Sequence, residues 1–411
     1  MTASPTPIIL RFSRQRNPNA PVPSYGTDAP QMDLVYAVAV AASQEELLAG
    51  TPPPAVSITI PASLAWPSPH APVGAGALWQ LIPPAVQAQI SGAAEAVQLL
   101  IVSGDRTIDL LPWELLPGLG KAPAGLSVAR LVPFLLQPPP LSVVLPIRLL
   151  LVTSNAKDER SFSDRETVVL RSCVKPEVYQ VREIANATPV SAVQIIHDFD
   201  PHIVHYVGHG GMVSGEGAVL LRDESSGSTN WIGAGQISQA LPVSTRLFCL
   251  STGFSQRNFD ITGLVGFAHS PATVRLPTCV LNRADVDEAG VTAFWSGFYD
   301  TLGGSGGNVL LAFDAGLAGL RPPHTTTAPD SFSLLLCDGG AQPLKVAQFV
   351  DLNRYAAEVQ AQFAARLASD LNEKLKSFEG TELGGKLKES FSEERSRFST
   401  FSSSAAKYDS E

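Results

Sequence analysis

The stretch PHIVHYVGHGG (201–211) decides the fold, together with a second stretch of the same shape, RLFCLSTG (246–253). In each, an apolar run of strand length ends in small or polar residues. This pattern is typical of strands that are buried on both faces of a parallel sheet. The carboxyl ends of such strands meet at one edge, where the loops that leave them carry functional residues. We therefore expect His209 and residues 251–253 to lie at a common edge of the sheet.

Strands and helical patterns alternate on both sides of these two stretches. The other strand-like runs of this part lie at 147–155, 278–287 and 331–340, and helical patterns cover 166–198, 291–302 and 308–320. Alternation of this kind predicts an α/β fold: a mainly parallel sheet with helices on both faces.

The two ends of the chain differ from this central part. Residues 1–65 contain three short runs rich in apolar and β-branched residues, at 7–12, 34–41 and 55–61, and predict a β-rich lobe. A helical pattern at 77–92, broken near Pro83 and Pro84, and a strand at 96–104 follow. We expect three parts: an N-terminal β-rich segment (1–65), a central domain (66–343) and a helical tail (344–411).

The tail carries apolar side chains every three or four residues from Leu352 to Phe378, which predicts one apolar stripe on a long helix. Two interpretations remain open: the stripe packs on the rest of the chain, or the 352–378 helix mediates self-association or binds a partner. The last dozen residues are rich in Ser, Ala and charge, and we expect them to be disordered.

Composition narrows the possible functions. The net charge is −9 and no basic cluster is present, which argues against nucleic-acid binding. The N-terminus lacks a signal-peptide pattern, and no apolar run approaches the length of a membrane helix, so we expect a cytoplasmic protein without a membrane segment.

No metal or other cofactor is expected. The four cysteines are far apart and form no CxxC pair, which argues against structural zinc and a disulfide framework. His202, His205 and His209 have a spacing that suggests a metal site. On a strand, however, His202 and His205 point to opposite faces.

Several motifs, in order, resemble the CHAT peptidases, caspase-like domains related to separase and the caspases. The resemblance covers roughly residues 66–343. Its segments are LLPWELLPG (110–118), a strand ending in VAR (128–130), RLLLVTSN (148–155), PHIVHYVGHGG, RLFCLSTGF (246–254), VLNRADVDEAGVTAFWSGFYDTL (280–302) and SFSLLLCDGG (331–340). It implies a caspase-like sheet flanked by helices.

The resemblance also implies a site. In the family, a cysteine thiolate attacks a peptide carbonyl and a histidine assists. By motif position, His209 is the histidine, and Gly210 or Gly211 provides an oxyanion-hole amide. The nucleophile position falls on Gly253, which has no side chain with which to form an acyl-enzyme.

Three nearby residues are alternative nucleophiles. Cys249 lies inside the apolar strand, where a thiol is inert, whereas Ser251 and Thr252 lie at the strand end. Asp285 and Asp287 follow the strand at 278–282 and either line a groove for a basic side chain or face water.

Three functional hypotheses follow. The first is an inactive CHAT-like pseudopeptidase that binds a protein segment, as a regulator or scaffold in a bacterial multi-component system such as a defence system. The second is an active peptidase that pairs His209 with a non-standard nucleophile. The third is a structural subunit that forms oligomers through its tail.

Overall fold

The computed structural model of the chain describes residues 6–15, 33–48, 55–61, 64, 74–102, 105–118, 125–132, 139–154, 160–213, 216–223, 228–252, 276, 278–282, 286–320, 327, 331–337 and 341–347. The chain divides into two compact units, Met1–Lys345 and Val346–Glu411. Almost all of the second unit, including the predicted 352–378 helix, lies outside the described residues.

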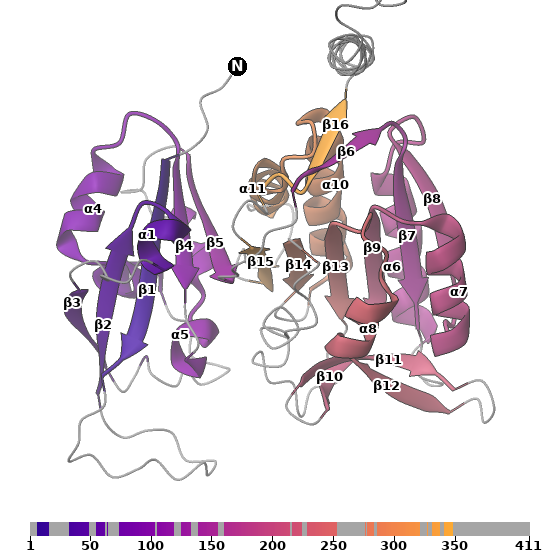
Figure 1. Cartoon of the computed structure of the whole chain (residues 1–411), viewed down its shortest axis with the longest axis horizontal. Coiled ribbons are helices and arrows are strands. Elements are labelled where there is room, and N and C mark those ends of the chain that lie inside the picture. Colours follow the sequence, from indigo (N-terminus) through magenta and orange to yellow (C-terminus); the bar gives the residue numbers. More distant parts are fainter. Residues whose placement is uncertain are drawn as a thin grey trace, which may run out of the picture. The chain divides into compact units, whose positions relative to one another are not determined.

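A single large sheet organises the first unit (Figure 1). Its eleven described strands run in the order β3-β2-β1-β4-β5-β15-β14-β13-β9-β7-β8. All neighbouring strands are parallel except in the pairs β1–β2, β2–β3 and β14–β15. The predicted α/β class and mainly parallel sheet are therefore confirmed.

The strands of this sheet are β1 (Thr6–Arg14), β2 (Leu34–Ala41), β3 (Ala55–Ile60), β4 (Val97–Val102), β5 (Leu126–Val132), β7 (Ile147–Thr153), β8 (Tyr179–Ile184), β9 (Ile203–Gly208), β13 (Leu247–Thr252), β14 (Thr278–Asn282) and β15 (Phe332–Cys337). Two short strands, β6 (Leu141–Val144) and β16 (Leu344–Ala347), form a separate pair. The helices are α1 (Gln44–Leu48), α3 (Ala75–Gln80), α4 (Pro84–Ser91), α5 (Arg106–Leu110), the 3-10 helix η1 (Trp113–Gly118), α6 (Arg160–Cys173), α7 (Pro189–Phe199), α8 (Ala234–Ala240), α10 (Glu288–Gly304) and α11 (Val309–Gly319).

Local sequence explains where the helices beside the site begin. Thr188 and Ser191 form a reciprocal capping box at the start of α7, and Pro189 occupies its first turn. Asp287 caps α10 through its Oδ1 atom, which accepts a hydrogen bond of 2.6 Å from the Gly290 amide.

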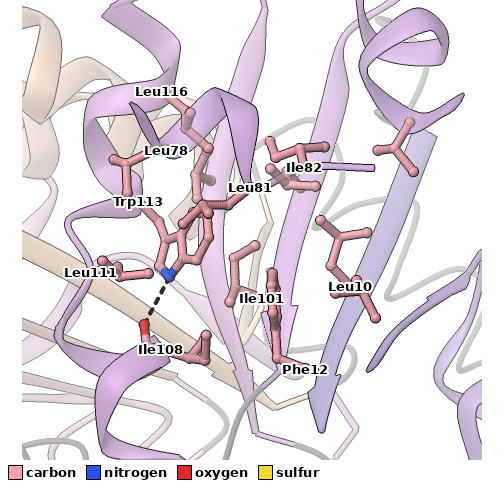
Figure 2. Packing of buried hydrophobic residues seen from close by; sticks show 14 of the residues in the cluster. Leu10, Phe12, Leu78, Leu81, Ile82, Ile101, Ile108, Leu111, Trp113 and Leu116 are labelled. Atoms are coloured by element: carbon pink, nitrogen blue, oxygen red, sulfur yellow. Dashed lines mark hydrogen bonds between the residues drawn. The ribbon is translucent and has the colours of Figure 1, made fainter. Parts of the chain in front are cut away.

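The first strands, β1 to β5, share an apolar core with α3, α4, α5 and η1 (Figure 2). Trp113 is at its centre: the indole N–H donates to the Ile108 carbonyl at 2.9 Å, and the ring lies 5.5 Å from that of Phe12. Since β1 pairs with β4, strands β1 to β3 continue the large sheet. The division predicted at residues 65 and 66 stays a prediction.

The structure differs from the sequence prediction at two places. The helical pattern at 166–198 is interrupted, since β8 separates α6 from α7 and forms an edge of the large sheet. The glycine-rich stretch after residue 209 is not only a loop. It opens a second, antiparallel sheet of β10 (Gly210–Val213), β11 (Glu216–Arg222) and β12 (Thr229–Gly233).

Candidate functional site

His209 is the residue that joins the two sheets, between β9 and β10. Its carbonyl accepts a hydrogen bond of 3.0 Å from the Leu220 amide of β11, and the Tyr206 hydroxyl lies 3.1 Å from the same oxygen. Burial raises the pKa of Tyr206, so this phenol stays protonated as a donor. The backbone at His209 is thus fixed from both sides, and its side chain is half-buried.

Gly208 is a position where a side chain has no room. A Cβ atom added there would lie 2.7 Å from the Ser154 carbonyl oxygen and would also collide with the Tyr206 hydroxyl. The close approach of these groups to the backbone therefore requires glycine immediately before His209.

The neighbouring strand β13 ends level with Gly208, one residue before His209. In the parallel pairing of β13 with β9, Ser251 lies beside Val207 and Thr252 beside Gly208. In the sequence, His209 follows β9 and Gly253 follows β13. Gly253 lies outside the described residues, as does the side chain of Thr252.

Ser251 points away from solvent, into the layer between the sheet and α6. Its side chain is 1% exposed and its hydroxyl donates a hydrogen bond to Glu166 Oε1 of α6. Burial raises the pKa of Glu166 to about 7, while the bond from Ser251 lowers it. A hydroxyl in this position serves packing and has no access to a substrate in the described structure.

Cys249 is 0% exposed and lies opposite His205 of β9 in the same layer. Burial raises the pKa of its thiol, and its side chain is hydrogen-bonded to Tyr299 of α10. A neutral, buried thiol is a poor nucleophile.

His205 belongs to the same buried cluster. Its Nδ1 atom lies 2.6 Å from the Tyr299 hydroxyl, and its ring lies 4.4 Å from that of Trp295. Burial lowers the pKa of His205 to about 3, so the imidazole is neutral. His202 is also held as a neutral acceptor: its Nδ1 takes a 3.1 Å hydrogen bond from the Arg148 amide, and burial with Arg148 lowers its pKa to about 4. Within the described residues, no group of three or more His, Cys, Asp or Glu is placed to hold a metal ion.

The remaining candidates have separate positions. Gly210 and Gly211 form the first half of β10. Asp287 is the exposed cap of α10, and its Oδ1 also accepts a 3.0 Å bond from Thr327. Asp285 lies outside the described residues.

Sequence reasoning missed two residues beside the site. Nothing in the sequence indicates that Glu166 accepts a hydrogen bond from Ser251, which lies 85 residues later. Trp231 lies on β12, and its ring lies against Gly211. The alternating run TNWIG around it is a strand signal that the glycine-rich context obscured.

A buried ion pair connects two segments that the CHAT resemblance is based on, LLPWELLPG (110–118) and the strand that contains VAR (128–130). Arg130 of β5 donates from Nη2 to Glu114 Oε2 at 3.2 Å and to the Leu111 carbonyl at 2.9 Å. Ser333 of β15 donates to Glu114 Oε1 at 2.7 Å. These contacts connect η1 to two neighbouring strands at the middle of the large sheet.

None of the described helices combines the length and the apolar character that crossing a bilayer requires. None of the curated proteins matches this chain significantly.

Two crystal structures of the Saccharomyces cerevisiae separase–securin complex resemble the chain at 12% identity, with TM-scores of 0.35 and 0.33. The matches cover 59% and 61% of this chain but only 15% and 16% of the chains in those structures. A family model, the CHAT domain, matches residues 74–331. That match includes both strands that meet at His209, the buried Glu114–Arg130 pair and helices α6 to α11. The chain therefore belongs to the CHAT domain family.

Proposed function

We propose that this chain is a non-cleaving CHAT-domain protein that binds a segment of a partner protein at the edge where β9 and β13 end. It would then act as a regulator or scaffold in a bacterial multi-component system such as a defence system. The CHAT domain proper occupies residues 66–343 in this proposal, and the tail from residue 344 is a second interaction element.

One observation carries the proposal. The register of β13 with β9 ends at the pair Thr252–Gly208, so the residue that follows on one strand is His209 and on the other Gly253. The position at which the family's thiol is expected therefore belongs to a residue without a side chain.

The neighbouring nucleophiles support the same interpretation. Cys249 and Ser251 are both buried in the layer under α6 and α10, and each has a hydrogen-bond partner there. Bringing Ser251 or Cys249 to position 253 would require β13 to shift by two or four residues, which would break the described pairing of β13 with β9 and β14.

The proposal is tested by restoring the thiol. In the Gly253→Cys variant, we expect a thiol that iodoacetamide alkylates rapidly at pH 7, because a nearby imidazole stabilises the thiolate. The double variant Gly253→Cys, His209→Ala should react at least tenfold more slowly.

Two results would count against the proposal. One is equal alkylation rates in the single and double variants, which would show that His209 does not affect a thiol at position 253. The other is hydrolysis of a peptide library by the unmodified protein that is lost on His209→Ala, which would identify an active peptidase.

A further inference from the structure

The three-stranded sheet β10–β11–β12, drawn below β9 and β13 in Figure 1, has two different faces. Val219 and Leu221 of β11 belong to the hydrophobic cluster formed with β9, β13 and α7. Because successive side chains of a strand point to opposite faces, Leu220 and Arg222 lie on the other side, which we call the outer face.

The strand register places His209 on this outer face. Leu220 pairs with Trp231 of β12, and the Leu220 amide donates to the His209 carbonyl at 3.0 Å. His209, Leu220 and Trp231 therefore form one row across the small sheet. The second row on the same face lies two residues further along each strand. It consists of residues with little or no side chain: Gly211, Ala218 and Gly233.

The indole of Trp231 lies across that second row. A Cβ atom added at Gly211 would be 2.7 Å from Cη2 of the ring, so an indole anchored on β12 reaches over β11 to β10. The residue is nevertheless 40% exposed. The result is a flat aromatic surface on the outer face, at the edge of the sheet that also carries His209.

Strand β10 is an edge of the small sheet in the described part of the chain. An edge strand presents backbone N–H and C=O groups with which an extended segment can pair. Its side chains would then alternate, and those on the outer face would be two residues apart.

We propose that β10 binds an extended segment of a partner protein as an added strand. An aromatic side chain of that segment packs against Trp231 beside Gly211, and an acidic side chain two positions away lies beside His209, within reach of Arg222. This inference names the chemistry of the partner and rests on the proposed function.

Charge complementarity is the reason for the acidic residue. Arg222 lies two residues from Leu220 on β11, on the same face as His209, and has no ion pair with any described carboxylate. A guanidinium presented in this way selects a carboxylate, which it can bind through two parallel hydrogen bonds. Trp231 is the reason for the aromatic residue in the partner segment, because contact between two aromatic rings contributes more binding free energy than the burial of their surface alone.

The test uses the full chain and two fluorescein-labelled peptides, Ser-Thr-Glu-Val-Tyr-Thr-Ser and Ser-Thr-Tyr-Val-Glu-Thr-Ser, because the strand direction fixes the order of the acidic and aromatic residues. Fluorescence anisotropy should show that only one of the two peptides binds. Replacing its Glu by Gln, or Arg222 by Gln, should each weaken binding about tenfold, and both changes together should add little more.

Gly211→Ala tests the aromatic surface without removing it. The new methyl group displaces the indole, and we expect a loss of binding of about tenfold, while Gly76→Ala, at a position with open space around it, leaves binding unchanged. Arg11→Gln, at an exposed arginine of β1, is the matched control for charge. N-methylation of alternate peptide amides, which blocks strand pairing, should abolish binding.

Absence of binding by both peptides at about 1 mM would overturn the inference, as would binding that is indifferent to Gly211→Ala and to N-methylation. Either result leaves the proposed function standing, because that is tested by the reactivity of the Gly253→Cys variant. Hydrolysis of a bound peptide would contradict the proposed function alone.

Discussion

At the scale of single residues, the site depends on which face of β13 each side chain occupies. Cys249 and Ser251 both point under α6 and α10, where Tyr299 and Glu166 bind them. The sequence predicted that this strand ends at the site, but not the face of each residue. A strand buried on both sides shows no polar–apolar alternation, so the pattern that assigns faces in half-buried strands is missing.

Glu166 makes the stability of the fold depend on pH. Its folded pKa of about 7 exceeds the ordinary value of 4.5, so the folded protein holds a proton that the unfolded chain loses as the pH rises. Its contribution is therefore fully present below the unfolded value and is lost as the pH rises to about 7.

We expect Glu166→Gln to leave the free energy of unfolding almost unchanged at pH 5 and to raise it by about 2 kcal/mol relative to the parent at pH 8. Urea denaturation at both pH values measures this. Glu95→Gln, at an exposed carboxylate, is the control. A stability difference that is the same at both pH values would show that Glu166 does not titrate in the folded protein in this range.

Gly208 provides a second residue-scale prediction. Gly208→Ala places a Cβ atom against the Ser154 carbonyl and should destabilise the protein by about 2 kcal/mol, because the backbone at the end of β9 must move. Thermal unfolding measures the loss, with Gly76→Ala as the control. Equal melting temperatures for the two variants would contradict the close packing before His209.

At the scale of elements, the sequence predicted most strands of the large sheet and the two last helices. It missed β8 because the run YQVREI mixes polar and apolar residues and lies between two helical patterns. It missed β10 to β12 because β10 is short and begins with two glycines, and because the glycines in β11 and β12 and in the loops around them obscure the strand signal. Pairing with β7, a nonlocal contact, stabilises β8, whereas β10 to β12 pair with one another as consecutive hairpins.

The ion pair between η1 and β5 should be important for folding. Arg130 and Glu114 are both buried, so Glu114→Gln leaves a buried guanidinium without its counter-ion and should cost about 3 kcal/mol or more in the free energy of unfolding. Chemical denaturation measures this. For comparison, Glu183→Gln, which breaks the exposed pair with Arg171, should cost less than about 1 kcal/mol. Similar losses for the two variants would contradict the role given to the buried pair.

At the scale of the whole molecule, the chain consists of one compact unit up to Lys345 and a second from Val346 onwards. The apolar stripe of the predicted 352–378 helix lies in the second unit. The periodicity of the sequence does not identify what this stripe packs against, because a helix that packs on its own chain and a helix that packs on another copy carry the same kind of apolar stripe.

We predict that the tail mediates self-association. Deletion of residues 348–411, which keeps β16 complete, should leave the melting temperature of the first unit within a few degrees of the parent value, since its core lies before the deletion. Light scattering should then give the mass of a monomer for the truncated chain and a multiple of it for the full chain. The same number of subunits in both would refute self-association through the tail.

Our central proposal is that the edge beside His209 has no nucleophile. Intact-mass spectrometry after incubation with peptide acyloxymethyl ketones and with a fluorophosphonate tests it most directly, because together these probes capture thiol and hydroxyl nucleophiles. We predict that the unmodified chain keeps its mass and that Gly253→Cys gains one ketone adduct that His209→Ala suppresses. A His209-dependent adduct on the unmodified chain would contradict the account.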